Sequence, residues 1–275
     1  MTQPLVALRG VTCRFGDVCA VDGLDLDVAQ GETVGLIGPN GSGKSTTLGL
    51  VAGTLRPTAG AIRLAGADVT RVPAWRRVAL GIAWTFQQPR VFERLSVRDN
   101  LAAAGRDAAD AALHDAALAH RRHALAATLT FAERRRLELA RALALRPRVL
   151  LVDEPASGLD ANELATLRER LAALRARGVA IVLVEHRVGF VAQLAERIVV
   201  LEHGRVLATG TPAHVLADPA VCRAYLGAHF GAHLGAHLGA HLGAHLGAHL
   251  GAHLGAHLGA HLGNAPAPQP GCAAA

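Results

Sequence analysis

Nine consecutive residues near the N-terminus have the composition of a phosphate-binding loop. Residues 38–46 carry glycine at the first, fourth and sixth positions, followed by Lys44 and Ser45. Glycine lets backbone N–H groups converge on phosphate oxygens, while the lysine reaches the β- and γ-phosphates and the serine hydroxyl binds Mg²⁺. The residues expected to hold a nucleoside triphosphate are therefore Gly38, Pro39, Asn40, Gly41, Ser42, Gly43, Lys44, Ser45 and Thr46.

The sequence on either side of this loop supports the same prediction. Residues 33–37 form an apolar run typical of a buried parallel strand, and residues 44–52 suit a helix. A strand, a glycine-rich loop and a helix, in this order, form the context that a P-loop needs. Lys44 is also the only lysine, since the other 27 basic residues are arginines. An ammonium and a planar guanidinium are not equivalent at a crowded phosphate site, which favours a functional role for Lys44.

A second pattern places two carboxylates at the end of another strand. Residues 149–152 are apolar, and Asp153 and Glu154 follow directly. An acid at the carboxyl end of a buried parallel strand is the Walker B arrangement, in which the first acid holds Mg²⁺ and the second polarises an attacking water. Adjacent acids also occur as helix caps, but the P-loop in the same chain favours the catalytic interpretation.

Two more strand ends and one turn carry candidate residues. Gln87 follows the run 81–86 and His186 follows the run 179–184, so both are expected at the same rim of the sheet as the phosphate loop and the two acids. Phe15 ends a strand just before a Gly-Asp turn, where its ring can stack on an adenine. Its periodicity alone favours an ordinary core residue.

The composition limits the possible classes of protein. The chain has 275 residues and a formal net charge of +6, all of it before residue 227. Its arginines are scattered among acids without interleaved aromatic residues, so we do not expect nucleic-acid binding. The four cysteines lack metal or redox spacing and indicate free thiols in a reducing compartment. The N-terminus shows no signal pattern and the body no uncharged bilayer-length run, so a membrane role requires a partner.

The remaining residues indicate the elements that position these groups. Residues 4–30 form short alternating runs, which predict a small antiparallel sheet. Residues 96–145 are rich in Ala, Leu and Arg and predict helices, with Ser96 and Thr130 as N-caps. The predicted fold class is α/β: a P-loop NTPase core sheet, an N-terminal antiparallel β subdomain and a short helical subdomain at about 90–140.

In this order the motifs resemble those of the ATP-binding subunits of ABC transporters, over roughly residues 4–226. Within the family, residues 81–87, 135–143 and 210–212 are most similar to the subunits of branched-chain amino acid importers. The matching features are Phe15 as the A-loop aromatic, residues 38–46 as Walker A, Gln87 as the Q-loop glutamine, residues 129–133 as the signature, residues 149–154 as Walker B, residues 157–160 as the D-loop and His186 as the switch histidine.

The resemblance implies ligands and partners. Two ATP molecules with Mg²⁺ would lie in a head-to-tail dimer with a second ATP-binding subunit, identical or different, and Thr130 of each signature would face the other subunit's ATP. Glu154 would orient water, His186 would contact the γ-phosphate, and Gln87 would join the metal site to the membrane partner. The subunit would lie at the cytoplasmic face of the membrane, on permease subunits served by an extracytoplasmic solute-binding protein. The residues expected at the metal are Ser45, Gln87 and Asp153.

Two departures from the family pattern stand out. The family's Leu-Ser-Gly-Gly-Gln signature reads Leu-Thr-Phe-Ala-Glu at residues 129–133. Both glycines are replaced, and Glu133 adds a negative charge near ATP, so we expect reduced or tuned hydrolysis. The stretch 101–128 before the signature is also shorter than the family's helical subdomain.

The C-terminal part has a different composition. Residues 227–262 contain nine copies of a four-residue repeat, Gly-Ala-His-Leu with one Phe, and residues 263–275 are a Pro- and Ala-rich tail expected to be disordered. We interpret the repeat as a spacer that arose by replication slippage. Histidine pairs at i, i+4 that chelate Zn²⁺ or Ni²⁺, and a membrane-surface role at low pH, are the alternatives.

The sequence thus predicts an ATPase that powers import of branched-chain or related amino acids, or a urea-like solute. One alternative is a nucleotide-binding regulatory subunit with weak hydrolysis, which the altered signature motivates. Another is a soluble ABC ATPase outside transport. The single nucleotide domain and the lack of a long charged coiled-coil insertion disfavour that second alternative.

Overall fold

Two sheets and their helices make up the computed structural model, which describes residues 3–105 and 109–224. The strands are β1 (Val6–Phe15), β2 (Val18–Val28), β3 (Thr33–Ile37), β4 (Ala59–Leu64), β5 (Ala67–Asp68), β6 (Ile82–Thr85), β7 (Val149–Asp153), β8 (Ala180–Val184), β9 (Arg197–Glu202) and β10 (Arg205–Gly210). The helices are α1 (Lys44–Ala52), α2 (Ala74–Ala79), α3 (Val97–Ala102), α4 (Ala109–Asp115), α5 (Phe131–Ala144), α6 (Ala161–Ala176), α7 (Val188–Leu194) and α8 (Pro212–Ala217), with short 3-10 turns η2 (Ala119–Arg121) and η3 (Ala126–Thr128).

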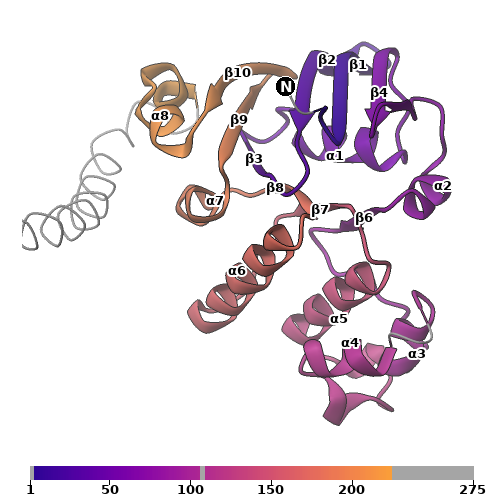
Figure 1. The fold of residues 1–275 in the computed structure, drawn as a ribbon. Helices are drawn as coiled ribbons and strands as arrows, with labels where there is room; N and C mark the ends of the chain where they lie inside the picture. Colours follow the sequence, from indigo (N-terminus) through magenta and orange to yellow (C-terminus); the bar gives the residue numbers. More distant parts are fainter. Residues whose placement is uncertain (1–2, 106–108, 225–275) are drawn as a thin grey trace, which may run out of the picture. The chain divides into compact units, whose positions relative to one another are not determined.

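The larger sheet has six strands in the order β10-β9-β3-β8-β7-β6 (Figure 1). Its five strands from β9 to β6 are parallel, and β10 pairs antiparallel at one edge. Strands β3, β7 and β8 are buried along their whole length, as expected for a parallel sheet covered on both faces. The predicted α/β class with a P-loop core sheet is confirmed.

Alternate residues of the central strands enter two different cores. Leu151 and Val182 join a core that lies between the two sheets and contains α1, whereas Leu150 and Leu183 join a core on the other face with residues of α6 and α7. Each fully buried aliphatic side chain stabilises the fold by about 1.5–3 kcal/mol. The carboxyl ends of the strands are thereby fixed from both sides.

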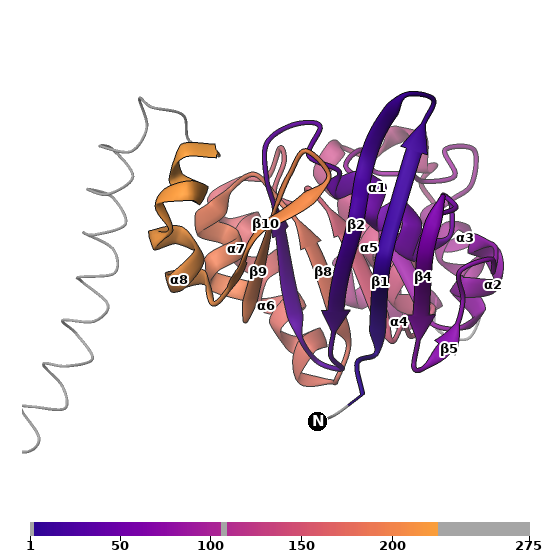
Figure 2. The same cartoon turned by 90° about the horizontal axis from the view of Figure 1, so that it is seen from above.

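The smaller sheet is the predicted antiparallel β subdomain, with strands in the order β2-β1-β4-β5 (Figure 2). The short runs expected before residue 16 form one strand here, β1. Gly10 has φ +57°, and the register shifts between Leu8 and Val11, so an irregularity bends the strand without ending it. The sheet covers α1 and the phosphate loop.

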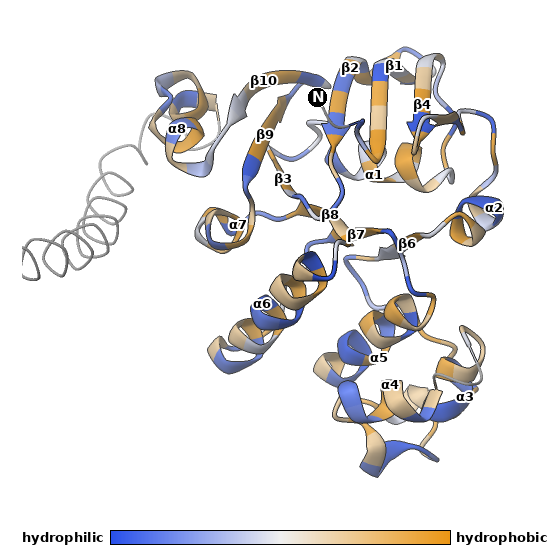
Figure 3. Cartoon of the chain, viewed as in Figure 1, coloured by the Kyte–Doolittle hydropathy of each residue, from blue (hydrophilic) through white to orange (hydrophobic). Residues whose placement is uncertain are grey.

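The helices α3, α4 and α5 enclose a third apolar core. Both predicted N-caps are present, because the Ser96 hydroxyl accepts from Asp99 N at 3.0 Å and the Thr130 hydroxyl from Glu133 N at 3.2 Å. Helix α5 carries polar and apolar residues (Figure 3) and contacts β6, so it links this helical part to the core sheet.

Parts of the sequence predictions fall outside the described residues. These are the tandem repeat 227–262, the tail 263–275 and Cys272. In the two described ranges, no helix is both long enough and apolar enough to cross a membrane.

Candidate active site

The glycine-rich loop joins β3 to α1 and lies tightly against neighbouring backbone. Gly38 has φ +151°, and a β-carbon there would lie 2.1 Å from the Leu201 carbonyl oxygen. Gly43 has φ +103°, and a β-carbon there would lie 2.4 Å from the Ala20 carbonyl oxygen. Only glycine meets both conditions, a left-handed φ and no space for a side chain. The loop is thus wedged between β9 and β2, with its N–H groups at the start of α1.

Lys44 begins α1 and turns back over this loop. Its Nζ donates to the carbonyl oxygens of Gly38 at 2.8 Å and Pro39 at 2.9 Å, and the residue is only 6% exposed. Burial lowers the pKa of the ammonium, while the carboxylates Glu154 and Asp153 oppose that shift. The position suits a cation that neutralises phosphate charge above the loop.

Glu154 lies between two of the other predicted site residues. Gln87 donates from Nε2 to its Oε2 at 2.6 Å, and Nε2 of His186 lies 2.6 Å from its Oε1. The backbone of Glu154 has φ +45°, a left-handed conformation that is uncommon for a residue with a side chain. Three side chains that are far apart in sequence, from the ends of β6, β7 and β8, therefore converge at one rim of the sheet.

Asp153 is buried beside Glu154 and has the electrostatics of a metal ligand. Burial, together with the negative charge of Glu154, raises its pKa to about 6, although a hydrogen bond with Ser45 and the charge of Lys44 oppose the shift. Its buried Oδ1 has no hydrogen-bond partner among the described residues. An unsatisfied buried carboxylate oxygen next to the P-loop serine fits Mg²⁺ bound together with phosphate oxygens.

No cluster of three or more His, Cys, Asp or Glu side chains able to hold a metal occurs in the described part of the chain. Mg²⁺ bound with a nucleotide usually takes only one or two carboxylates, together with waters and substrate phosphates. The residues described above that could hold it are Asp153 and Ser45.

Phe15 lies at the end of β1 with 51% of its surface exposed, so its interpretation as a core residue is wrong. The backbone of Ala20 in β2 lies against Gly43 of the phosphate loop, which places the β1–β2 hairpin beside that loop. Phe15 is therefore available to a planar group at the phosphate site, and its stacking on adenine remains a prediction.

Arg135 and Glu138 hold the Gln87 segment, and neither is among the predicted site residues. The Arg135 guanidinium donates to the carbonyl oxygens of Phe86 and, at 2.5 Å, of Gln87. One Glu138 carboxylate oxygen accepts from Phe86 N at 3.2 Å and from Arg90 N at 2.9 Å. Their spacing at i, i+3 on α5 predicts an ion pair, but nothing local in the sequence connects that pair to residues about 50 positions earlier.

Glu185 is a second residue without a predicted role. Its buried carboxylate accepts from Ala156 N at 2.7 Å, His186 N at 2.8 Å and Arg187 N at 3.0 Å. It thus ties the turn after Walker B to the strand end that carries His186. An acid immediately before a candidate histidine at a strand end is the signal that could have identified it.

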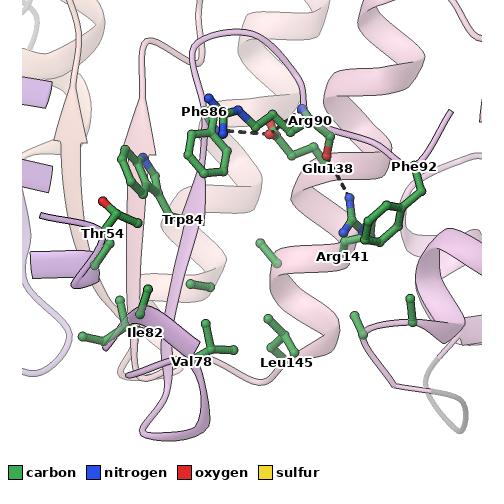
Figure 4. A pocket seen from close by; sticks show the side chains of 16 residues that line it. Thr54, Val78, Ile82, Trp84, Phe86, Arg90, Phe92, Glu138, Arg141 and Leu145 are labelled. Carbon is green, nitrogen blue, oxygen red and sulfur yellow. Dashed lines mark hydrogen bonds between the residues drawn. The ribbon is translucent and has the colours of Figure 1, made fainter. Parts of the chain in front are cut away.

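A groove of about 420 Å³ lies behind the Gln87 segment (Figure 4). Its lining is mainly apolar, with side chains from α2, β6 and α5. Arg141 lies over the ring of Phe92 and donates to the Arg90 carbonyl oxygen at 2.8 Å. The Phe86 ring packs 4.4 Å from Trp84, so one end of the groove is formed by residues adjacent to Gln87.

The signature residues lie at the start of α5. The carboxylate of Glu133 accepts from Thr130 N at 2.9 Å, which completes a capping box, and from Arg121 Nε at 3.1 Å. The negative charge expected at Glu133 is therefore present but paired. Within the described ranges, the hydrogen bonds of Thr130 are made inside α5 and not to the Walker A or Walker B residues.

Comparison with known proteins is consistent with this geometry. Residues 21–157 match the family described as ABC transporter, and residues 205–231 match the family described as Branched-chain amino acid ATP-binding cassette transporter. The branched-chain amino acid transport ATP-binding protein BraF of Pseudomonas aeruginosa is 35% identical over 253 residues, covering 82% of this chain and 99% of BraF. The chain belongs to the ATP-binding subunits of ABC transporters.

Other members of this family agree. LivG of Salmonella typhimurium is 36% identical over 253 residues, with 82% of this chain and 99% of LivG covered. The crystal structure of the ADP conformation of MJ1267, an ATP-binding cassette of an ABC transporter, has a TM-score of 0.75 and 26% identity and covers 82% of this chain and all of that chain. ATP-binding subunits of ABC transporters hydrolyse ATP to drive transport.

Proposed function

We propose that this ATP-binding subunit hydrolyses Mg-ATP to power import of a branched-chain or related amino acid. The observation that carries the proposal is the position of Glu154 between Gln87 and His186, beside Asp153 and Lys44. The cargo class is supported by the printed functions of BraF and LivG and by the match of residues 205–231.

The proposed roles of the site residues divide between binding and catalysis. Lys44 and the loop N–H groups would bind the β- and γ-phosphates. Ser45 and Asp153 would hold Mg²⁺, which when bound neutralises phosphate charge. Glu154 orients the attacking water and accepts its proton. Gln87 and His186 fix the two carboxylate oxygens of Glu154, and His186 would contact the γ-phosphate. Orientation of a bound nucleophile and charge stabilisation are the main contributions to phosphoryl transfer.

The second half of each ATP site is proposed to come from another ATP-binding subunit, identical or different. Thr130 begins α5, whose N-terminus attracts anions through its free N–H groups, but it shares no hydrogen bond with Walker A or B among the described residues. A head-to-tail dimer would bring that helix to the partner's ATP. Phe15 would stack on the adenine.

The groove behind Gln87 is proposed as the docking surface for a membrane-spanning permease subunit. Arg135 and Glu138 bond both the backbone next to Gln87 and, through Phe86 and Arg90, the wall of the groove. Movement of a permease segment in the groove would therefore reach Glu154 through one residue, Gln87. The subunit would lie at the cytoplasmic face of the membrane, and an extracytoplasmic solute-binding protein would deliver the cargo.

ATP turnover in the assembled transporter tests the catalytic part. Wild type is expected to hydrolyse ATP, and Glu154→Gln is expected to lower turnover by about 100-fold or more, because the general base is lost. Glu169→Gln, an exposed acid on α6, is the matched control. Equal turnover in wild type and Glu154→Gln contradicts the assignment. Recovery of turnover in a Phe131→Gly/Ala132→Gly variant would then place the defect in the signature.

Uptake into vesicles tests the cargo. Vesicles that contain the permease subunits are expected to take up labelled leucine with ATP inside and wild-type subunit, and to lose uptake with Glu154→Gln. ATP turnover without uptake of leucine, isoleucine or valine would support the ATPase function but reject branched-chain amino acids as the cargo.

A further inference from the structure

Glu133 replaces a neutral residue of the family signature with a charged one, at the place where a phosphate is expected. Its side chain is 10% exposed and accepts hydrogen bonds from Thr130 N and Arg121 Nε. Burial alone would raise the pKa of this carboxyl, but those two hydrogen bonds and the charge of Arg121 hold it below its ordinary value. Glu133 is therefore ionised under neutral conditions.

An ionised carboxylate in the first turn stabilises α5 but opposes an anion at the same helix end. The helix N-terminus is partially positive, so Glu133 cancels part of the field that would attract an ATP phosphate. A cation fixed on the carboxylate restores the balance. Two side chains of the described residues supply positive charge here, Arg121 at 3.1 Å and His120 at 4.0 Å when protonated.

The backbone beside Arg121 is held in place independently of α5. It ends the short turn η2, and the residues after it bond to the start of α3, because Arg98 N donates to the Arg122 carbonyl oxygen and Val97 N to that of Ala124, both at 3.0 Å. The neighbouring guanidinium of Arg134 is directed elsewhere, to the carbonyl oxygens of Leu129 and Ala127. The guanidinium of Arg121 thus lies against Glu133 from a backbone segment that is bonded to α3.

We propose that Arg121 is a positioning residue for the altered signature: it neutralises and orients Glu133 so that the N-terminus of α5 can accept the ATP phosphate of the partner subunit. This inference rests on the proposed head-to-tail ATP site. It makes Arg121 and Glu133 a compensating pair, in which the cation is needed only because the acid is present.

A double-mutant cycle tests this pair. Arg121→Ala is expected to lower ATP turnover about 10-fold with little change in the Kd for ATP, which binds first to Walker A. In a Glu133→Gln background, Arg121→Ala is expected to change turnover by less than about twofold. Arg122→Ala is the matched control, because Arg122 is the next residue, is similarly exposed and pairs with Asp110 at 3.0 Å instead. The proposal is overturned if Arg121→Ala lowers turnover equally in the wild-type and Glu133→Gln backgrounds. It is also overturned if Arg122→Ala lowers turnover as much as Arg121→Ala does.

A second readout separates this inference from the proposed function. Sedimentation of Glu154→Gln chains measures ATP-driven dimerisation, which depends on the signature but does not require hydrolysis. Arg121→Ala is expected to raise the ATP concentration needed for dimerisation about 10-fold, and Glu133→Gln to remove that shift. Dimerisation that is insensitive to Arg121 rejects the inference alone. A chain that neither turns over ATP nor dimerises with it rejects the proposed function as well.

Discussion

The phosphate loop and the signature segment differ in how they accommodate a change of residue type. At the phosphate loop, Gly38 and Gly43 press on neighbouring backbone, and the only lysine of the chain closes the loop. At the signature, four of the five residues differ from the family pattern, yet α5 still begins with a complete capping box. Where backbone packs directly on backbone, only glycine fits, because there is no space for a β-carbon. Several residue types can accept hydrogen bonds from the free N–H groups of a helix N-terminus, provided that a charge such as that of Glu133 is paired.

The largest effect is expected at Lys44. Lys44→Ala should lower ATP turnover by about 100-fold or more, because it removes the buried cation of the phosphate loop. Lys44→Arg should not restore it, since a planar guanidinium does not replace an ammonium held by two loop carbonyls. Turnover and ATP Kd of the purified variants measure this, with the exposed Arg71→Ala as control. An active Lys44→Arg variant would show that the phosphate loop accepts a cation other than lysine at this position.

Substitutions of the loop glycines should lower the free energy of unfolding by different amounts, depending on the space around each glycine. Gly43→Ala should destabilise the chain by about 3 kcal/mol, since it combines a left-handed φ with a backbone clash. Gly41→Ala should cost only about 1 kcal/mol, because φ is +78° but nothing lies within 4 Å. Denaturant unfolding gives both free energies. Equal costs would mean that the packing against Ala20 does not fix the loop.

Asp153 should show a conflict between stability and function. Its raised pKa means that the folded chain prefers the protonated form, so stability falls as pH rises from about 4 to about 6, and the full cost remains above pH 6. In metal-free buffer at pH 8, Asp153→Asn should therefore stabilise the chain by about 2 kcal/mol, and by less at pH 5. Chemical unfolding at the two pH values, with exposed Asp17→Asn as control, is the measurement. Destabilisation at pH 8 would contradict this account.

An effect on stability as small as that of Gly41→Ala is expected at the signature. Thr130→Ala should destabilise the chain by about 1 kcal/mol through loss of the N-cap of α5. Thr211→Ala removes the N-cap of α8 and should cost a similar amount. Only Thr130→Ala should also weaken ATP-driven dimerisation. If both variants weaken it, or neither does, the hydroxyl of Thr130 acts only as a helix cap.

The same contrast governs what the sequence could predict. The phosphate loop, the two acids of Walker B and the caps Ser96 and Thr130 follow from local spacing, and the structure has the corresponding elements. The contacts that complete the site are long-range. Arg135 reaches the backbone at Gln87, 48 residues away, so no local pattern encodes it.

Two further features depended on tertiary structure. Exposure of Phe15 depends on where the β1–β2 hairpin ends, since an aromatic residue in an alternating run is usually buried. The pairing of Arg121 with Glu133 crosses an irregular segment between α4 and α5, where periodicity carries no information. Both required the position of one element relative to another.

Completion of one subunit's ATP site by the signature of another subunit is tested most directly by sedimentation. The measurement compares Glu154→Gln alone with Glu154→Gln combined with Thr130→Trp, both in the presence of Mg-ATP. We predict an ATP-dependent dimer for Glu154→Gln, and a monomer that binds ATP with a Kd within about twofold for the double variant. Dimerisation that is equally strong in both would show that α5 does not face the partner's nucleotide, and would contradict the account.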